Sequence, residues 1–101
     1  MDYIIVISSD PTDSFDYEQG LEVAMTLTDL EQPCAVCLEG EFLDKVANSR
    51  GDEVFVKKLK QLELFGIELF SPIKPNLSFC SVKTYSELFE IYKNAKVVIS
   101  F

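Results

Sequence analysis

The hydrophobic positions of the chain begin with an unbroken apolar run, Tyr3–Ile7, which contains three isoleucines and a valine. A strand with one solvated face alternates apolar and polar residues, whereas a continuous run indicates a strand that is covered on both faces. Residues 8–11, Ser-Ser-Asp-Pro, end the run, because proline has no N–H to donate and serine and aspartate favour turns. We therefore expect Tyr3–Ile7 to lie near the middle of a sheet.

The rest of the chain alternates between helical and strand-like patterns. Apolar residues at helical spacing predict helices at Tyr17–Leu30, Glu41–Ala47, Asp52–Phe65 and after Thr84. Short apolar runs predict further strands at Cys34–Leu38, Ile67–Phe70, Leu77–Val82 and Lys96–Phe101. This alternation is typical of an α/β fold with helices packed on a mainly parallel sheet. We expect a single domain that spans residues 1–101.

Two local signals refine the helices. Gly20 lies inside the first helix, where glycine costs up to about 1 kcal/mol relative to alanine, so we expect it to mark close packing against the sheet. Thr84 and Glu87 form a Thr-x-x-Glu capping box that starts the last helix. In that helix Leu88, Tyr92 and Ala95 recur on one side, with Phe89 beside them. We expect this side to face the sheet.

Charge and composition exclude several classes of function. The chain of 101 residues has 17 acidic and 9 basic residues, a net charge of −8, and no histidine. Nucleic-acid surfaces need clustered Lys and Arg, so direct binding of RNA or DNA is not expected. Without histidine, a hydrolase triad or a zinc centre would need unusual substitutes. The first residues lack a basic segment and no apolar run approaches the roughly 20 residues of a membrane helix, so we expect a cytoplasmic protein.

The acidic loop after the first strand bears on cofactor binding. A phosphate or flavin loop at this place presents backbone N–H groups from glycines or hydroxyl residues. Residues 10–16 contain no glycine and three aspartates, so no nucleotide or flavin cofactor is expected. A signalling receiver domain would use such aspartates together with a phosphoacceptor Asp at the end of another strand and a lysine. Those positions hold Glu39-Gly40 and Ser71-Pro72, and the lysine is missing.

Three cysteines are the remaining candidates for chemistry. Cys34 and Cys37 form a C-x-x-C pattern, which in redox proteins places the first thiol at a helix N-terminus. Here both lie in a strand-like run, where residues i and i+3 point to opposite faces, so the two thiols should not meet. We interpret them as structural core residues. An odd number of cysteines and no secretion signal favour free thiols over disulfides.

Four segments carry a resemblance to a known family. They are the opening strand Tyr3–Ile7 with its serine-rich exit, Glu18–Glu22, Leu62–Ile67 and Asn94–Phe101. In these segments and in its element order the chain resembles the DsrE/DsrF-like family of small sulfur-transfer proteins, most closely the DsrF/TusC branch. The resemblance implies a three-layer α/β/α, flavodoxin-like fold with a mostly parallel five-stranded sheet.

The resemblance also implies a role in a cytoplasmic sulfur-relay complex. Such complexes pass persulfide sulfur between partner proteins, as in tRNA 2-thiouridine synthesis or sulfur oxidation. The implied partners are related DsrE/TusD-like and DsrH/TusB-like subunits in a hetero-oligomer, and a homo-oligomer can form when the chain is isolated. The chain would be a scaffold with no catalytic turnover of its own.

One departure from the family pattern leaves alternatives open. In thiol-bearing members the acceptor cysteine follows the third strand, where this chain has Ser71-Pro72-Ile73. Cys80 lies further along and is either a core residue of the fourth strand or a displaced persulfide carrier, which would make the chain a sulfurtransferase. An alternative from another class is a small-ligand or signalling domain with the same fold.

Overall fold

The structure is a computed structural model and describes residues 2–75 and 77–101. The helices are α1 (Asp16–Asp29), α2 (Gly40–Ala47), α3 (Val54–Leu64) and α4 (Tyr85–Asn94). The strands are β1 (Tyr3–Ile7), β2 (Cys34–Leu38), β3 (Glu68–Ser71), β4 (Cys80–Val82) and β5 (Val97–Ser100). These elements confirm the strand-helix alternation that the sequence predicts.

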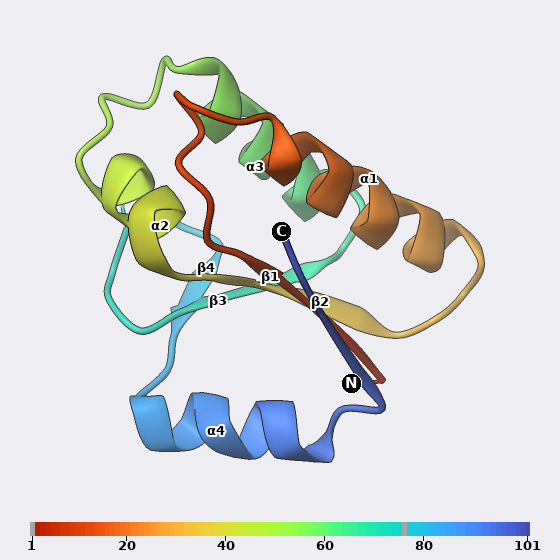
Figure 1. Ribbon diagram of the computed structural model, residues 1–101. Coiled ribbons are helices and arrows are strands. Elements are labelled where there is room, and N and C mark those ends of the chain that lie inside the picture. The colour runs from red at the N-terminus through yellow and green to blue at the C-terminus, as the bar shows by residue number, and fades with distance from the viewer. Residues whose placement is uncertain (1, 76) are drawn as a thin grey trace.

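The strands form one five-stranded sheet in the order β4-β3-β2-β1-β5, and each neighbouring pair is parallel. β1 pairs with β2 and β5, so that Ile5 lies between Val36 and Ile99. The middle strand is therefore β2, and β1 lies one strand from the edge (Figure 1). All five residues of β2 are buried, as a continuous apolar run in a parallel sheet requires.

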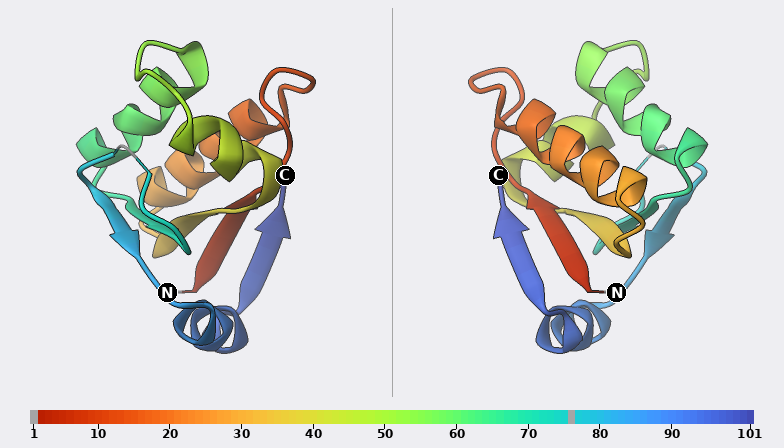
Figure 2. Two further views of the ribbon diagram at one scale, coloured as in Figure 1. Left: turned by 90° about the vertical axis from the view of Figure 1, so that its left-hand side faces the viewer. Right: turned by 90° about the vertical axis from the view of Figure 1, so that its right-hand side faces the viewer.

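Helices cover both faces of the sheet, so the fold has three layers, α/β/α, in a flavodoxin-like arrangement that confirms the predicted fold class. α1, α2 and α3 pack on one face, whereas α4 alone covers the other (Figures 1 and 2). The core is correspondingly divided. The larger cluster lies under α1–α3 and contains Ile5, Val36 and Leu59; the smaller lies under α4 and contains Ile4, Phe70 and Leu88.

The fourth strand is shorter than predicted. The sequence predicts a strand over Leu77–Val82, but β4 begins at Cys80. The N–H of Cys80 donates to the carbonyl of Leu77 at 3.3 Å, which closes a turn there. Leu77 is buried in the larger core cluster, so its side chain contributes hydrophobic burial without belonging to the strand. The other predicted helix and strand ends agree with the structure or differ from it by at most two residues.

Gly20 of α1 makes the close packing that its sequence position predicts. A Cβ atom built on Gly20 would lie 3.1 Å from the ring of Phe101 and 3.3 Å from Ile7. These distances leave no room for a side chain without displacing a neighbour. The glycine therefore allows α1 to approach the sheet directly over β1 and the residue that follows β5.

Candidate functional site

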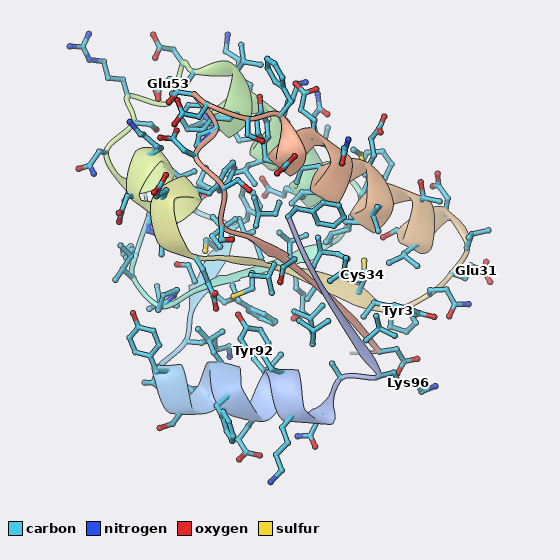
Figure 3. All side chains as sticks on the ribbon, in the orientation of Figure 1. Tyr3, Glu31, Cys34, Glu53, Tyr92 and Lys96 are labelled. Atoms are coloured by element: carbon cyan, nitrogen blue, oxygen red, sulfur yellow. The ribbon has the colours of Figure 1, made fainter. Side chains whose placement is uncertain are left out.

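Cys34, the first residue of β2, is held at the amino end of the sheet. Its side chain is buried, and its Sγ lies 3.4 Å from the carbonyl oxygen of Ala24 and 3.5 Å from the hydroxyl of Thr28. Both partners belong to α1, so the thiol joins that helix to the strand (Figure 3). This position has the character of a structural contact between helix and sheet.

Cys37 belongs to the opposite face, under α4. The hydroxyl of Tyr92 lies 2.9 Å from Cys37 Sγ and 2.5 Å from Glu39 Oε1. Tyr92 has one hydroxyl proton, and the charged carboxylate is the stronger acceptor of the two. Figure 3 shows the Tyr92 side chain directed from α4 toward the sheet. These three residues therefore form a polar link between α4 and the carboxyl end of β2.

The environment of this link keeps the Cys37 thiol and the Tyr92 hydroxyl protonated. The pKa of the Cys37 thiol is raised from its ordinary value of 9.0 to about 11, mainly by burial. The hydrogen bond from Tyr92 opposes this rise, and the nearby Glu39 carboxylate contributes to it. Burial also raises the pKa of Tyr92, as do its hydrogen bonds to Cys37 and Glu39. A nucleophilic thiol needs a low pKa. Cys37 therefore has the character of a neutral core residue.

The two cysteines of the C-x-x-C pattern belong to different core clusters, Cys34 under α1–α3 and Cys37 under α4. This confirms the prediction that strand geometry directs them to opposite faces of the sheet. Both are free and buried. The redox interpretation of the motif is therefore excluded by geometry.

Cys80 lies on β4, at one edge of the sheet, and is half-buried. It pairs in register with Leu69 of β3, and its side chain packs against the cluster under α1–α3. Burial raises the pKa of the Cys80 thiol, while a hydrogen bond with Ser71 lowers it. The net shift is upward, so the thiol is mainly protonated at neutral pH.

Ser71 and Lys83 are neighbours of Cys80 in the fold or in the sequence, and each makes further contacts of its own. Ser71, the last residue of β3, is completely buried, and its hydroxyl donates to the carbonyl of Ile73. The ammonium group of Lys83 lies 5.6 Å from the centroid of the Phe70 ring, on the α4 side of the sheet. Lys83 is thus directed away from the face against which Cys80 packs.

A crevice of about 400 Å³ opens at the carboxyl ends of β2 and β3. Glu39, Gly40 and Asp44 line one wall, and Pro72, Ile73 and Tyr85 line the other. Ligands of open α/β sheets bind at this edge. Gly40 has a φ of +54°, and a Cβ there would lie 3.2 Å from the carbonyl oxygen of Ser8, so glycine is needed to begin α2 beside β1.

The loop after β1 uses its own hydrogen-bonding groups internally. The N–H groups of Ser8 and Ser9 donate to the carbonyl of Phe101 at 2.9 and 3.3 Å. The Asp10 carboxylate accepts bonds from the N–H and hydroxyl of Thr12 at 2.8 and 2.6 Å, and these bonds lower the pKa of Asp10. An anion at the end of β1 would therefore meet the carboxylate of Asp10, because the N–H groups of Ser8 and Ser9 already have partners.

Residues 2–75 and 77–101 contain no cluster of three or more His, Cys, Asp or Glu side chains that could hold a metal ion. In the same residues, no helix is long and apolar enough to cross a membrane.

Sequence reasoning singled out Cys80 but did not bring together Cys37, Glu39 and Tyr92. Two signals were present. Glu39 is a polar residue immediately after a buried strand, and Tyr92 is the one polar residue on the inward side of the last helix. Their convergence depends on α4 crossing beneath the end of β2, which only the three-dimensional arrangement shows.

Comparison with known proteins supports the fold. No family model and no curated protein matches the chain. Among solved structures, the crystal structure of the ychN protein from E. coli is similar over the full length of both chains, with a TM-score of 0.74 and 16% sequence identity. At this identity the likeness establishes the shared α/β/α fold.

Proposed function

We propose that this chain is a scaffold subunit of a DsrE/DsrF-like sulfur-relay complex in the cytoplasm. In this role it supports persulfide transfer between partner proteins, as in tRNA 2-thiouridine synthesis or sulfur oxidation, and does not carry the sulfur itself. The shared fold and the sequence resemblance support the family. The burial of the thiols carries the proposal for the scaffold role.

A thiol that accepts sulfur must be exposed and substantially ionised near neutral pH. Cys34 and Cys37 are buried. Cys80 is half-buried, and its pKa is raised by that burial. This combination favours a subunit that binds its partners while another subunit presents the reactive thiol.

An exposed aromatic pair on α4 fits this role. Tyr85 and Phe89 are 77% and 65% exposed, and their spacing of four residues places them one above the other on the helix. Aromatic residues are enriched in the centres of protein interfaces. We propose that related DsrE/TusD-like and DsrH/TusB-like subunits bind this part of the surface.

A second candidate function is sulfur transfer through Cys80. The observation in its favour is that Cys80 is the cysteine with partial exposure, at the sheet edge and in hydrogen-bond contact with Ser71. In this function the terminal sulfur of a donor persulfide would transfer to the Cys80 thiolate, and the donor cysteine would leave as a thiolate. The oxidation state of the transferred sulfur would not change.

Intact-mass spectrometry distinguishes the two functions. The chain is incubated with a cysteine desulfurase and cysteine, beside a related thiol-bearing subunit as a positive control. The scaffold role predicts no added sulfur on this chain while the control gains one reducible sulfur atom. A gain that is lost in Cys80→Ser but kept in the matched Cys37→Ala variant would instead establish Cys80 as the carrier.

Reconstituted transfer tests the scaffold role directly. We expect sulfur to reach the downstream partner only when this chain is present, and we expect Cys80→Ser to support transfer as well as the unmodified chain. Transfer at the same rate without the chain would contradict the proposal. A yellow purified protein would favour the alternative of a small-ligand domain, through a bound flavin.

A further inference from the structure

The crevice at the carboxyl ends of β2 and β3 has two chemically different walls. One wall carries the carboxylates of Glu39 and Asp44, and the other is formed by Pro72, Ile73 and Tyr85. α2 reaches this end of the sheet from one face and α4 reaches it from the other (Figure 1). A ligand in the crevice would therefore contact negative charge on one side and mainly apolar surface on the other.

Both carboxylates of the acidic wall can accept further hydrogen bonds. Glu39 Oε1 accepts from the Tyr92 hydroxyl at 2.5 Å, which holds the Glu39 side chain in position. Within residues 2–75 and 77–101, Tyr92 is the one hydrogen-bond partner of the Glu39 side chain, and the Asp44 carboxylate has no hydrogen bond and no ion pair. An ionised carboxylate has about four sites for donors. The acidic wall is therefore able to bind an added donor group.

The two walls together identify an organic cation as the ligand. Both carboxylates would repel an anion, and a neutral apolar group would displace their water without replacing its hydrogen bonds. A calcium ion takes about six to eight oxygen ligands, whereas the described part of the chain contains no group of three or more potential metal ligands. The side chains of lysine and arginine have an apolar stem and a charged end, so they match both walls.

Tyr85 favours arginine over lysine as the cation. The Tyr85 side chain is 77% exposed, so its ring is accessible to a group in the crevice. A guanidinium group stacks on aromatic rings, is more weakly hydrated than an ammonium group and presents its N–H donors in a planar fork. It can therefore contact the Tyr85 ring and donate to a carboxylate at the same time.

Exposed apolar surface continues from the crevice along α4. Phe89 lies one helical turn after Tyr85 and is 65% exposed, and Ile73 of the apolar wall is 44% exposed. A free amino acid would fill the crevice and leave Phe89 in water, whereas a segment of a protein chain would cover both. The net charge of −8 attracts a basic partner. These features favour a segment of a basic protein as the occupant.

We propose that this crevice binds an arginine side chain of a partner protein. The guanidinium group donates to the carboxylates of Glu39 and Asp44, and the methylene groups of the arginine lie against the apolar wall. Apolar residues that flank the arginine contact Tyr85 and Phe89. This inference rests on the proposed role of the chain as a partner-binding subunit and adds the chemistry of the segment that it binds. It involves no thiol and no transfer of sulfur.

Nuclear magnetic resonance titration of the unmodified chain tests the charge requirement. The probe is a capped Leu-Arg-Leu peptide, and its control is Leu-citrulline-Leu, in which an uncharged group of the same shape replaces the guanidinium. We expect saturable shifts at the amides of Gly40 and Tyr85, with a dissociation constant at least about threefold higher for the citrulline peptide. Equal dissociation constants, or no saturable shift at these amides, would overturn the proposal.

A matched pair of variants separates binding in the crevice from general attraction by the net charge. Asp44→Asn should raise the dissociation constant of the arginine peptide at least about threefold. Asp29→Asn is the control, because it removes the same charge from the last residue of α1, at the opposite end of the sheet, and should change the constant little. Equal effects of the two variants would contradict a site in the crevice.

The exposed surface of α4 distinguishes a protein segment from a free cation. Phe89→Ala should weaken binding of the Leu-Arg-Leu peptide and leave binding of capped arginine alone unchanged. Capped arginine that binds as tightly as the peptide would show a site for a free cation and would overturn the assignment to a protein partner. Peptide binding does not depend on sulfur. A failure of reconstituted sulfur transfer with intact peptide binding would therefore count against the relay function, and not against this inference.

Discussion

At the scale of single residues, Gly40 has the most demanding backbone position. Its φ of +54° and its approach to Ser8 would both oppose a side chain. We expect Gly40→Ala to lose about 1–2 kcal/mol for the left-handed conformation and a further ~1–3 kcal/mol for the contact. Urea denaturation measures the loss.

Gly66 provides the matched control for this prediction. Its φ is +70°, but a Cβ there meets nothing within 4 Å, so Gly66→Ala carries the backbone strain without the contact. Equal losses of unfolding free energy in the two variants would show that the contact with Ser8 contributes nothing.

The buried thiol of Cys37 predicts a loss of stability in alkali. Its pKa rises from 9.0 to about 11 on folding, so between these values the unfolded chain releases a proton that the folded chain keeps. The stabilisation is complete below pH 9 and is lost as the pH rises through 11, amounting to about 2 to 3 kcal/mol. Denaturation across this range should show a shallower decline in Cys37→Ala. Identical pH profiles would exclude this role for Cys37.

The packing of a residue could be predicted from the sequence where nearby residues determine it. It could not be predicted where it depends on residues far away in the sequence. Gly20 was assigned correctly to close packing because glycine in a helix has few other purposes. The burial of Cys80 could not be read, because it depends on how far the turn after Leu77 extends and on the neighbouring β3. The contact of Tyr92 with Glu39 was missed because the two residues are 53 positions apart.

At the scale of elements, α4 depends on its capping box. Thr84 Oγ1 accepts from the N–H of Glu87 at 3.1 Å, and the Glu87 carboxylate accepts from the N–H of Thr84 at 3.0 Å. Thr84→Ala should lower the unfolding free energy by about 1 kcal/mol. Ser86→Ala, an exposed change within the same helical turn, is the control and should have little effect. A loss of the same size in both variants would exclude capping as the cause.

The bounds of helices and strands could be predicted where the spacing of apolar residues and the turn or helix-breaking residues indicated the same ends. The buried runs of β1 and β2 matched the structure at both ends because each is bounded by turn or helix-breaking residues. The two signals differ in the segment before β4. Leu77 is apolar because its side chain is buried in the core, although the residue does not belong to the strand. The coverage of one sheet face by α4 alone follows from topology, which no local pattern contains.

At the scale of the whole molecule, net charge predicts a response to salt. The net charge of −8 is spread over a molecule whose radius of gyration is 12.3 Å. The screening length falls from about 30 Å at 0.01 M to about 10 Å at 0.1 M, which weakens repulsion across the molecule. We expect the melting temperature to rise by roughly 2–4 °C over this range.

The control compares sodium and potassium chloride at low protein concentration, which separates screening from the binding of a particular ion and from association between molecules. Screening weakens the ion pairs Lys58–Glu18 and Lys96–Asp2 as well, but both are partly exposed and contribute little. A melting temperature that falls with salt would show that these pairs outweigh the general repulsion.

The pairing of β1 with β5 has a consequence for synthesis of the chain. The ribosome makes β1 before β5 and before all the elements that lie between them, so β1 lacks one of its two neighbours until residues 97–100 have emerged. During that interval its open edge belongs to an apolar strand that is ready to pair with other nascent chains. A pause in translation before β5 should therefore favour aggregation, and a chaperone that shields β1 would act at this stage.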